Sequence, residues 1–423
     1  MEIITSSIIT IGDELLIGQV VDTNSAWMAQ ELNQVGISVS RRVAVGDDWQ
    51  AIWNAIDQEM AGSHIVLVTG GLGPTADDIT KPLLNEYFGG KLVLNQKVLE
   101  HVRYLFDKVY KRPMIPRNEK QAEVPDTCTV IHNANGTAPG MWFEKNGRIL
   151  VSMPGVPFEM KGMMKDSVIP ELVGRYKLPL ILHRTMLTAG IGESFLADRI
   201  SAFENALPSH VKLAYLPHYG MVRLRLSATG FNREELIMQM DSLFETLQEQ
   251  LADVVATSRD EPMEAAVARL LLERNATLAT AESCTGGYIA HLITSRAGSS
   301  QYFNGSVISY ANAVKTDLLG VPEATLQSDG AVSEATVTQM VKGALASFKS
   351  DYAIATSGIM GPGGGSEEKP VGTVWIAAGN KNGVRAMRFQ FRFDRMRNIE
   401  LASFNALNFL RKFMLDQSFH PKN

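Results

Sequence analysis

Apolar and polar positions in the first 160 residues follow two different periods. Short apolar runs at 8–11, 39–45 and 65–69 have the length and β-branched content of buried strands. Between them, residues 24–34 and 49–60 place apolar side chains at helical spacing. Strands alternating with helices predict an α/β domain with a mainly parallel sheet covered on both faces, and ligands gather at the carboxyl ends of such strands.

The pattern changes between about residues 170 and 256. Residues 193–207 and 234–251 have helical spacing, and the run 221–228 alternates basic with apolar residues. Such alternation is typical of a sheet with one solvated face. This segment is therefore predicted to be a small α+β module, and the proline at 262 is suited to begin the next helix.

The remaining chain returns to strands alternating with helices. Apolar runs at 276–280, 305–309, 352–356 and 372–378 predict strands. A long apolar helix is predicted over 398–414, suited either to a dimer interface or to packing on its own sheet. Together the three patterns predict domains at 1–168, 169–257 and 258–423.

Composition narrows the class of protein. A chain of 423 residues with 45% hydrophobic and 20% charged content fits a globular protein of two or three domains. With 40 basic and 45 acidic residues, its net charge of -5 makes nucleic acid an unlikely partner. Two cysteines, Cys128 and Cys284, support neither a disulfide framework nor a cysteine zinc site. No signal or membrane-spanning run is evident, so a cytoplasmic location is expected.

Glycines and carboxylates follow each of the first three predicted strands. They are Gly12-Asp13-Glu14, Gly46-Asp47-Asp48 and the run from Thr69 to Asp78. Glycines let backbone N–H groups approach a phosphate, and carboxylates beside a phosphate indicate a divalent cation. The alternative is that the glycines only form turns and that Asp77 and Asp78 only favour the first turn of the next helix.

A second concentration of chemistry lies at Ser283-Cys284-Thr285-Gly286-Gly287. It separates a strand from a helix, which would aim the free N–H groups of that helix at whatever Ser283 attacks. Cys284 is a rival nucleophile, because thiols are intrinsically more reactive. The plainer alternative is a strand-to-helix turn in which Ser283 or Thr285 only caps the helix.

Lys315 is the predicted base for this nucleophile. Asn312 is a good helix cap, which puts Lys315 in the first turn, where the helix dipole lowers the pKa of an amine. Tyr310 precedes that helix and is suited to relay a proton, so the set is similar to serine hydrolases that use lysine as the base. Taken singly, such a lysine is common on solvated helices and such a tyrosine in cores. The glycine-rich loop 357–366 suits a lid or a phosphate cradle.

These residues resemble the CinA family of bacterial competence and damage-inducible proteins, and the resemblance covers essentially the whole chain. The matching strings in the last region are 281–287, Ala297-Gly298-Ser299-Ser300, 330–334, Ser357-Gly358 and 365–374. In the first region they are Gly12-Asp13-Glu14, Asp22-Thr23-Asn24, 69–78, 136–140 and 154–157.

For the last region the resemblance implies an α/β/α nicotinamide mononucleotide deamidase, which forms nicotinic acid mononucleotide and ammonia without a cofactor. Ser283 would be the nucleophile, Tyr310 and Lys315 would activate it, and Arg395 would support the substrate. The implied substrate contacts are Thr285, Gly286, Gly287 and Ser300 near the phosphate, with Ser357, Gly358 and Thr373.

The first region is similar to molybdopterin-binding domains, which implies a three-layer α/β fold and, in this family, metal-dependent hydrolysis of ADP-ribose to AMP and ribose 5-phosphate. Asp47, Asp77 and Asp78 would hold a divalent cation such as Mg, Co or Mn. The nucleotide contacts would be Gly12, Asp13, Glu14, Asn24, Gly70, Gly71, Gly73 and Thr75. The middle module resembles a KH fold without its nucleic-acid loop, and a homodimer is a family expectation.

Two features bear on this interpretation. Ala311 and Ala313 stand where the family pattern has serine and glutamate, and Met360 replaces a commonly small residue; these departures concern substrate fit more than catalysis. The rival hypothesis is a non-catalytic nucleotide- or pterin-binding scaffold linked to DNA uptake or repair.

Overall fold

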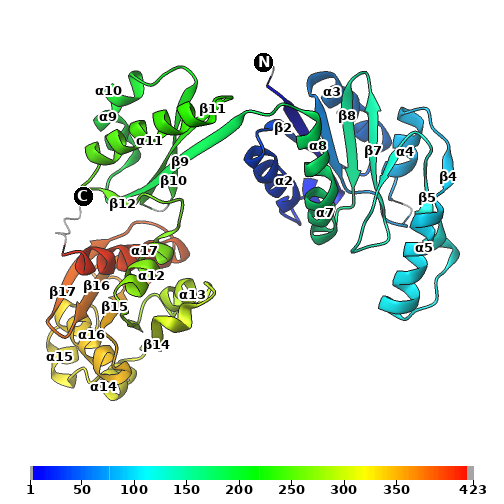
Figure 1. Ribbon diagram of the computed structural model, residues 1–423. Coiled ribbons are helices and arrows are strands. Elements are labelled where there is room, and N and C mark those ends of the chain that lie inside the picture. The colour runs from blue at the N-terminus through cyan, green and yellow to red at the C-terminus, as the bar shows by residue number, and fades with distance from the viewer. Residues whose placement is uncertain (1–2, 76, 219, 417–423) are drawn as a thin grey trace. The chain divides into compact units, whose positions relative to one another are not determined.

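A computed structural model describes residues 3–75, 77–218 and 220–416. The chain forms two compact units (Figure 1). The first runs to Leu182 and takes in Thr229–Ile237, and the second holds His183–Ala228 and the residues from Met238 onward. In the described residues, no helix is long and apolar enough to cross a membrane.

The first unit is built on a six-stranded sheet in the order β2-β1-β3-β8-β7-β6. The four strands from β2 to β8 are parallel, and β7 and β6 are antiparallel, which confirms the predicted mainly parallel sheet. The strands are β1 (Thr5–Ile11), β2 (Ser38–Val45), β3 (Ile65–Thr69), β6 (Thr129–Ile131), β7 (Gly140–Lys145) and β8 (Arg148–Met153), with a separate pair β4 (Leu92–Leu94) and β5 (Glu123–Pro125).

Helices cover both faces of this sheet because successive strand residues point to opposite sides and both sides are apolar. Ile8 packs in one core and its neighbour Ile9 in the other. The first core includes residues of α2 (Thr23–Gln34), α7 (Pro157–Met163), η3 (Met164–Val168) and α8 (Ile169–Arg175), and the second those of α3 (Trp49–Gly62) and α4 (Thr80–Tyr87). The other helices are α1 (Asp13–Leu16), α5 (Gln96–Tyr104), η1 (Leu105–Tyr110), α6 (Pro116–Glu119) and η2 (Lys120–Ala122).

The second unit begins with a four-stranded sheet in the order β10-β11-β9-β12. The single helix predicted over 193–207 was wrong: Ile200 has φ -107 and a fully buried side chain, and it separates two short helices. The elements are β9 (Leu180–Ala189), α9 (Glu193–Arg199), α10 (Ser201–Asn205), β10 (Val211–His218), β11 (Met221–Gly230), α11 (Arg233–Gln250) and β12 (Val255–Thr257).

The rest of this unit is a three-layer α/β/α domain around a five-stranded sheet, β14-β13-β15-β16-β17. β13 is parallel to β14 and β15, whereas β16 and β17 are antiparallel. The strands are β13 (Leu278–Glu282), β14 (Phe303–Ile308), β15 (Tyr352–Gly358), β16 (Thr373–Asn380) and β17 (Gly383–Gln390).

Two apolar cores hold the layers together. One includes buried residues of α12 (Met263–Glu273), α13 (Tyr288–Thr294) and α17 (Arg395–Met414), and the other those of α14 (Asn312–Leu319) and α16 (Glu334–Phe348). Leu407 and Leu410 of α17 are fully buried, so this helix packs on its own sheet. Two short helices complete the domain, η4 (Ser299–Gln301) and α15 (Glu323–Ser328).

Candidate active sites

Ser283 lies directly after β13, at the tip of a central strand as the sequence predicts. Its backbone N–H donates to the carbonyl of Thr356 at 2.9 Å, which ties the turn to the neighbouring strand β15. The residue is 8% exposed. The hydroxyl is therefore held on a rigid strand end at the surface of the core.

Lys315 reaches this hydroxyl from α14. Its Nζ donates to Ser283 Oγ at 3.2 Å and to the carbonyl oxygen of Ser309 at 2.7 Å. The residue is only 1% exposed, and burial lowers the pKa of its amine. The lowered pKa was predicted, but its main cause is desolvation rather than the helix dipole. The predicted cap was wrong, because Ala311 is the N-cap and Asn312 is the first helical residue.

Glu282 is the last residue of β13, and its carboxylate lies at the start of α13, the helix that follows Ser283. Its fully buried carboxylate accepts from the N–H groups of Gly287, Ile289 and Ala290 at 3.0, 3.1 and 2.8 Å, and from Thr285 Oγ1 at 2.7 Å. The prediction that these N–H groups are free for a ligand was therefore wrong. The chain supplies its own anion at that helix end.

Two backbone N–H groups follow Ser283 in the turn, and that of Cys284 lies against its own thiol. In the described part of the chain, the N–H groups of Cys284 and Thr285 donate to no carbonyl, hydroxyl or carboxylate oxygen. They follow the nucleophile directly in the turn. This is where an oxyanion formed at a carbon bonded to Ser283 Oγ would need donors.

Cys284 is poorly suited to act as the nucleophile. It is buried, and burial raises the pKa of its thiol to about 12. A thiol attacks as its thiolate, which is scarce when the pKa is that high. The geometry favours Ser283 over this rival.

Tyr310 and Arg395 form a second group at the edge of this site. Arg395 donates to the Tyr310 hydroxyl at 2.9 Å and to the carbonyl of Gly361 at 2.7 Å. Tyr310 is 63% exposed and follows Ser309, whose carbonyl holds Lys315. The pair therefore connects the end of β14, the start of α17 and the glycine-rich loop.

Some of the other predicted substrate residues are buried and hydrogen-bonded within the domain, and others are exposed to solvent. Ser357 is buried and donates to the carbonyl of Ala331 at 2.6 Å, and Thr373 is buried and donates to Gln390 at 2.9 Å. Gly286 and Ser300 are exposed. Gly358 ends β15, where a Cβ would crowd the carbonyl of Thr373 at 2.7 Å. Met360, one of the family departures, is buried in the apolar core beside α17.

In the first unit, the carboxyl ends of β1 and β2 bring several carboxylates together. The N–H groups of Asp13 and Asp47 each donate to the other's carboxylate, at 3.1 and 3.2 Å. Burial raises the pKa of Asp47, and the negative charges of Asp13, Glu14 and Asp77 raise it further. The sequence prediction that these strand ends share one edge is confirmed by the parallel pairing.

Asp78 is used within its own loop. Its carboxylate accepts from the N–H groups of Gly73 and Thr75, both at 2.8 Å, and from the Thr75 hydroxyl. These bonds tie Gly73 and Thr75 to Asp78 and engage both of its oxygens, and its role as a metal ligand stays a prediction. Among the described residues, no group of three or more His, Cys, Asp or Glu side chains is arranged to hold a metal ion.

The remaining predicted nucleotide contacts also lie at this edge. Gly12 donates to the carbonyl of Val45, and Gly70 donates to that of Met153. Gly70 has φ +115, and a Cβ there would collide with the backbone of Ile11. Asn24 donates to the carbonyl of Gly155 at 2.8 Å, whereas its buried Oδ1 has no partner. Gly71 accepts from the N–H of Thr80 at 3.2 Å.

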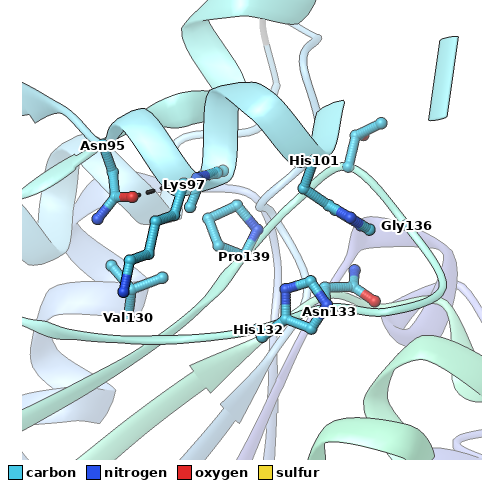
Figure 2. A pocket seen from close by; sticks show the side chains of 10 residues that line it. Asn95, Lys97, His101, Val130, His132, Asn133, Gly136 and Pro139 are labelled. Carbon is cyan, nitrogen blue, oxygen red and sulfur yellow. Dashed lines mark hydrogen bonds between the residues drawn. The ribbon is translucent and has the colours of Figure 1, made fainter. Parts of the chain in front are cut away.

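A cavity of about 250 Å³ in the first unit was not predicted from the sequence. Figure 2 shows that His101 enters it from α5, while His132 and Asn133 lie on the opposite wall. The two histidine rings meet edge to face, with centroids 4.6 Å apart. Asn133 also donates to Glu159 at 2.7 Å. His101 and His132 are far apart in sequence and belong to no motif, so no sequence signal paired them.

Comparison with known proteins agrees with this three-part organisation. Three family models match: "Probable molybdopterin binding domain" at residues 7–173, "Damage-inducible protein CinA KH domain" at 183–255 and "CinA C-terminal domain" at 260–414. A CinA-like protein of Flavobacterium psychrophilum is 44% identical over 411 residues, which cover 97% of this chain and 98% of that protein.

The chain belongs to the CinA family. A CinA-like protein of Cytophaga hutchinsonii is 45% identical over 409 residues, covering 97% of this chain and 98% of that protein. A solved CinA superfamily protein of Klebsiella pneumoniae is 34% identical, covers 36% of this chain and 96% of its own, and has a TM-score of 0.36. The predicted fold class, molybdopterin-binding-like, KH-like and CinA carboxy-terminal, is thus confirmed.

Proposed function

We propose that this CinA protein is an amidohydrolase whose carboxy-terminal domain converts nicotinamide mononucleotide to nicotinic acid mononucleotide and ammonia. The observation that carries the proposal is the contact of 3.2 Å between Lys315 Nζ and Ser283 Oγ. A buried amine of lowered pKa beside a hydroxyl on a strand tip is the arrangement of a serine nucleophile with a lysine base.

In the first step, neutral Lys315 accepts the proton of the Ser283 hydroxyl while Oγ attacks the carboxamide carbon. The carbonyl of Ser309 accepts one amine hydrogen and so orients the lone pair of Nζ toward Ser283. The N–H groups of Cys284 and Thr285 stabilise the oxyanion. Lys315 then returns the proton to the nitrogen of the substrate, the C–N bond breaks, and ammonia leaves.

In the second step, water hydrolyses the ester formed at Ser283. Lys315 takes a proton from that water and returns it to Ser283 Oγ as the acyl bond breaks. The products are the free acid and the original hydroxyl. All atoms come from substrate and water, so no cofactor is required.

Arg395 and Tyr310 are proposed to position the substrate. Their mutual hydrogen bond places a guanidinium and an exposed phenol at the edge of the site, next to the loop at Gly361. Arginine matches the geometry of a phosphate well. Gly286 and Ser300 are exposed and remain candidate phosphate contacts, and Ala311 and Ala313 are the departures that bear on substrate fit.

The test of this activity is incubation of the purified protein with nicotinamide mononucleotide and separation of the products. Wild type should form nicotinic acid mononucleotide and equimolar ammonia, and Ser283→Ala should form neither while its circular dichroism is unchanged. Equal turnover by both proteins would remove Ser283 from the mechanism.

For the amino-terminal domain we propose metal-assisted hydrolysis of ADP-ribose to AMP and ribose 5-phosphate. The support is the shared edge of carboxylates from Asp13, Glu14, Asp47 and Asp77. Mg²⁺ is commonly held by one or two carboxylates together with waters and substrate phosphates, so these oxygens fit it without a closed protein cage. The cation would neutralise phosphate charge as the bond breaks. Persistence of ADP-ribose cleavage after chelation would oppose this proposal.

A non-catalytic scaffold is the alternative function. It would bind a nucleotide or pterin at the amino-terminal edge without turnover, and its best support is that the carboxylates there form no three-ligand metal site among the described residues. Binding of ADP-ribose without product, together with no deamidation, would favour it. A cytoplasmic homodimer is proposed on the family resemblance alone.

A further inference from the structure

A second cavity, of about 370 Å³, lies in the second unit away from the residues described above. It is bounded by β12 and the residues after it, by α12 and by the last turns of α17. Three arginines line it, Arg259, Arg269 and Arg411, together with apolar side chains such as Leu270 and Leu415. Among the residues lining it there is no carboxylate. We call it the arginine cavity.

Arg411 is the unusual member of this set. It is only 3% exposed, and its Nε donates to Asn408 Oδ1 at 3.0 Å. In the described chain, no carboxylate lies within ion-pairing distance of its guanidinium. Burial lowers the pKa of Arg411 to about 10, which leaves it charged at neutral pH. Burying a charge without a group of opposite charge beside it costs free energy, and buried charges in proteins are normally paired.

Two acidic side chains close in sequence to the residues that line the cavity, Glu261 and Glu273, already form ion pairs with Arg269. Arg269 pairs with Glu261 at 3.0 Å and with Glu273 at 3.4 Å, and Glu261 also accepts from Thr257 Oγ1 at 2.7 Å. The Nε of Arg269 is buried without an acceptor. Arg259 is exposed and forms no ion pair within the described residues. The cavity therefore carries excess positive charge that the described chain does not neutralise.

We propose that the arginine cavity binds the phosphate group of a small phosphorylated metabolite. The planar guanidinium presents paired N–H donors that match phosphate oxygens, and three arginines line this cavity. The volume lies within the range of small-molecule sites, and the apolar wall of Leu270 and Leu415 suits the organic part of the ligand.

This site is separate from the proposed deamidase site. Both use α17, but Arg395 begins that helix and Arg411 lies near its end. At roughly 1.5 Å per residue the two positions are about 24 Å apart along the helix. A phosphate bound at Arg411 therefore does not occupy the place of the substrate phosphate near Ser283.

The test is calorimetric titration of the full chain with inorganic phosphate, AMP and adenosine at ionic strength held constant with chloride. The variants are Arg259→Ala, at an exposed position, and Arg411→Met. The control is Arg184→Ala, whose arginine pairs with Asp241 and does not line the cavity. Phosphate and AMP should each show a binding event that Arg259→Ala weakens by about 10-fold and that the control keeps.

Arg411→Met should abolish that event and unfold thermally at or above the wild-type temperature in phosphate-free buffer, because an uncompensated buried charge is gone. Adenosine should not bind at this site. The proposal is overturned if Arg259→Ala binds phosphate and AMP like wild type, or if adenosine binding depends on Arg259 as AMP binding does. If Arg411→Met fails to fold, Arg259→Ala decides the question. Deamidation by Arg259→Ala should equal wild type, which separates this result from the proposed enzyme.

Discussion

Replacing Lys315 with methionine should separate catalysis from stability. The methionine side chain is apolar and of similar length, so it fills the space that the buried lysine now occupies. It removes the amine that contacts Ser283 Oγ and the carbonyl of Ser309. We expect deamidation to collapse while the fold becomes no less stable at neutral pH.

The size of the catalytic loss follows from the role of the amine. General base catalysis contributes about 10²- to 10⁴-fold, which corresponds to roughly 3–5 kcal/mol of transition-state stabilisation. In wild type, deamidation should rise with pH as Lys315 loses its proton. It should level off above a pKa that lies below the ordinary lysine value of 10.5.

The stability advantage of Lys315→Met over wild type should fall as pH rises, whereas wild-type deamidation should rise. Because burial lowers the folded-state pKa of Lys315, the unfolded chain binds more protons between that pKa and 10.5. The wild type therefore gains stability as pH rises through this window. The advantage of Lys315→Met should be full below the folded pKa and should shrink as pH approaches 10.5.

The assay combines ammonia release across pH with urea unfolding at both ends of that window. Lys342→Met, at an exposed position on α16, is the matched control and should change neither property. A Lys315→Met protein with the wild-type pH profile of deamidation would refute the assignment of Lys315 as the base.

Three further predictions address neighbouring groups. Glu282→Gln should lower the free energy of unfolding by about 3–5 kcal/mol in urea titration, because the buried carboxylate that accepts hydrogen bonds from the start of α13 is lost. The control, Glu334→Gln at an exposed position, should have little effect. Cys284→Ala should keep wild-type turnover, since its thiol has a pKa of about 12; loss of activity without loss of fold would reinstate it. Asp47→Asn should reduce ADP-ribose hydrolysis by about 100-fold at saturating Mg²⁺, whereas Asp107→Asn should not, and equal rates would dismiss the proposed cation site.

The sequence predicted an element correctly where the apolar pattern of a segment and its length indicated the same kind of element. The runs at 65–69 and 352–356 became central strands because both of their faces are buried, which leaves a continuous apolar string. The helix predicted over 193–207 failed because Ile200 leaves helical geometry to bury its side chain. Such a break depends on tertiary packing, which the local period does not record.

The candidate deamidase site was only partly predictable. Ser283 and Lys315 were found from their places at a strand tip and in a first helical turn, and the structure brings them into contact. Glu282 was missed as a functional group because a residue at the end of a buried strand is read as part of the strand. Its carboxylate reaches forward to N–H groups five to eight residues later, and only the turn geometry reveals that.

The most direct test of the proposed mechanism is to trap the acyl-enzyme. Wild type should be mixed with nicotinamide mononucleotide, quenched with acid during turnover and analysed by intact and peptide mass spectrometry, with Ser283→Ala in parallel. We predict an added nicotinic acid mononucleotide acyl group on the peptide that contains Ser283, in wild type only. An adduct mapped to Cys284, or deamidation by Ser283→Ala at the wild-type rate, would contradict it.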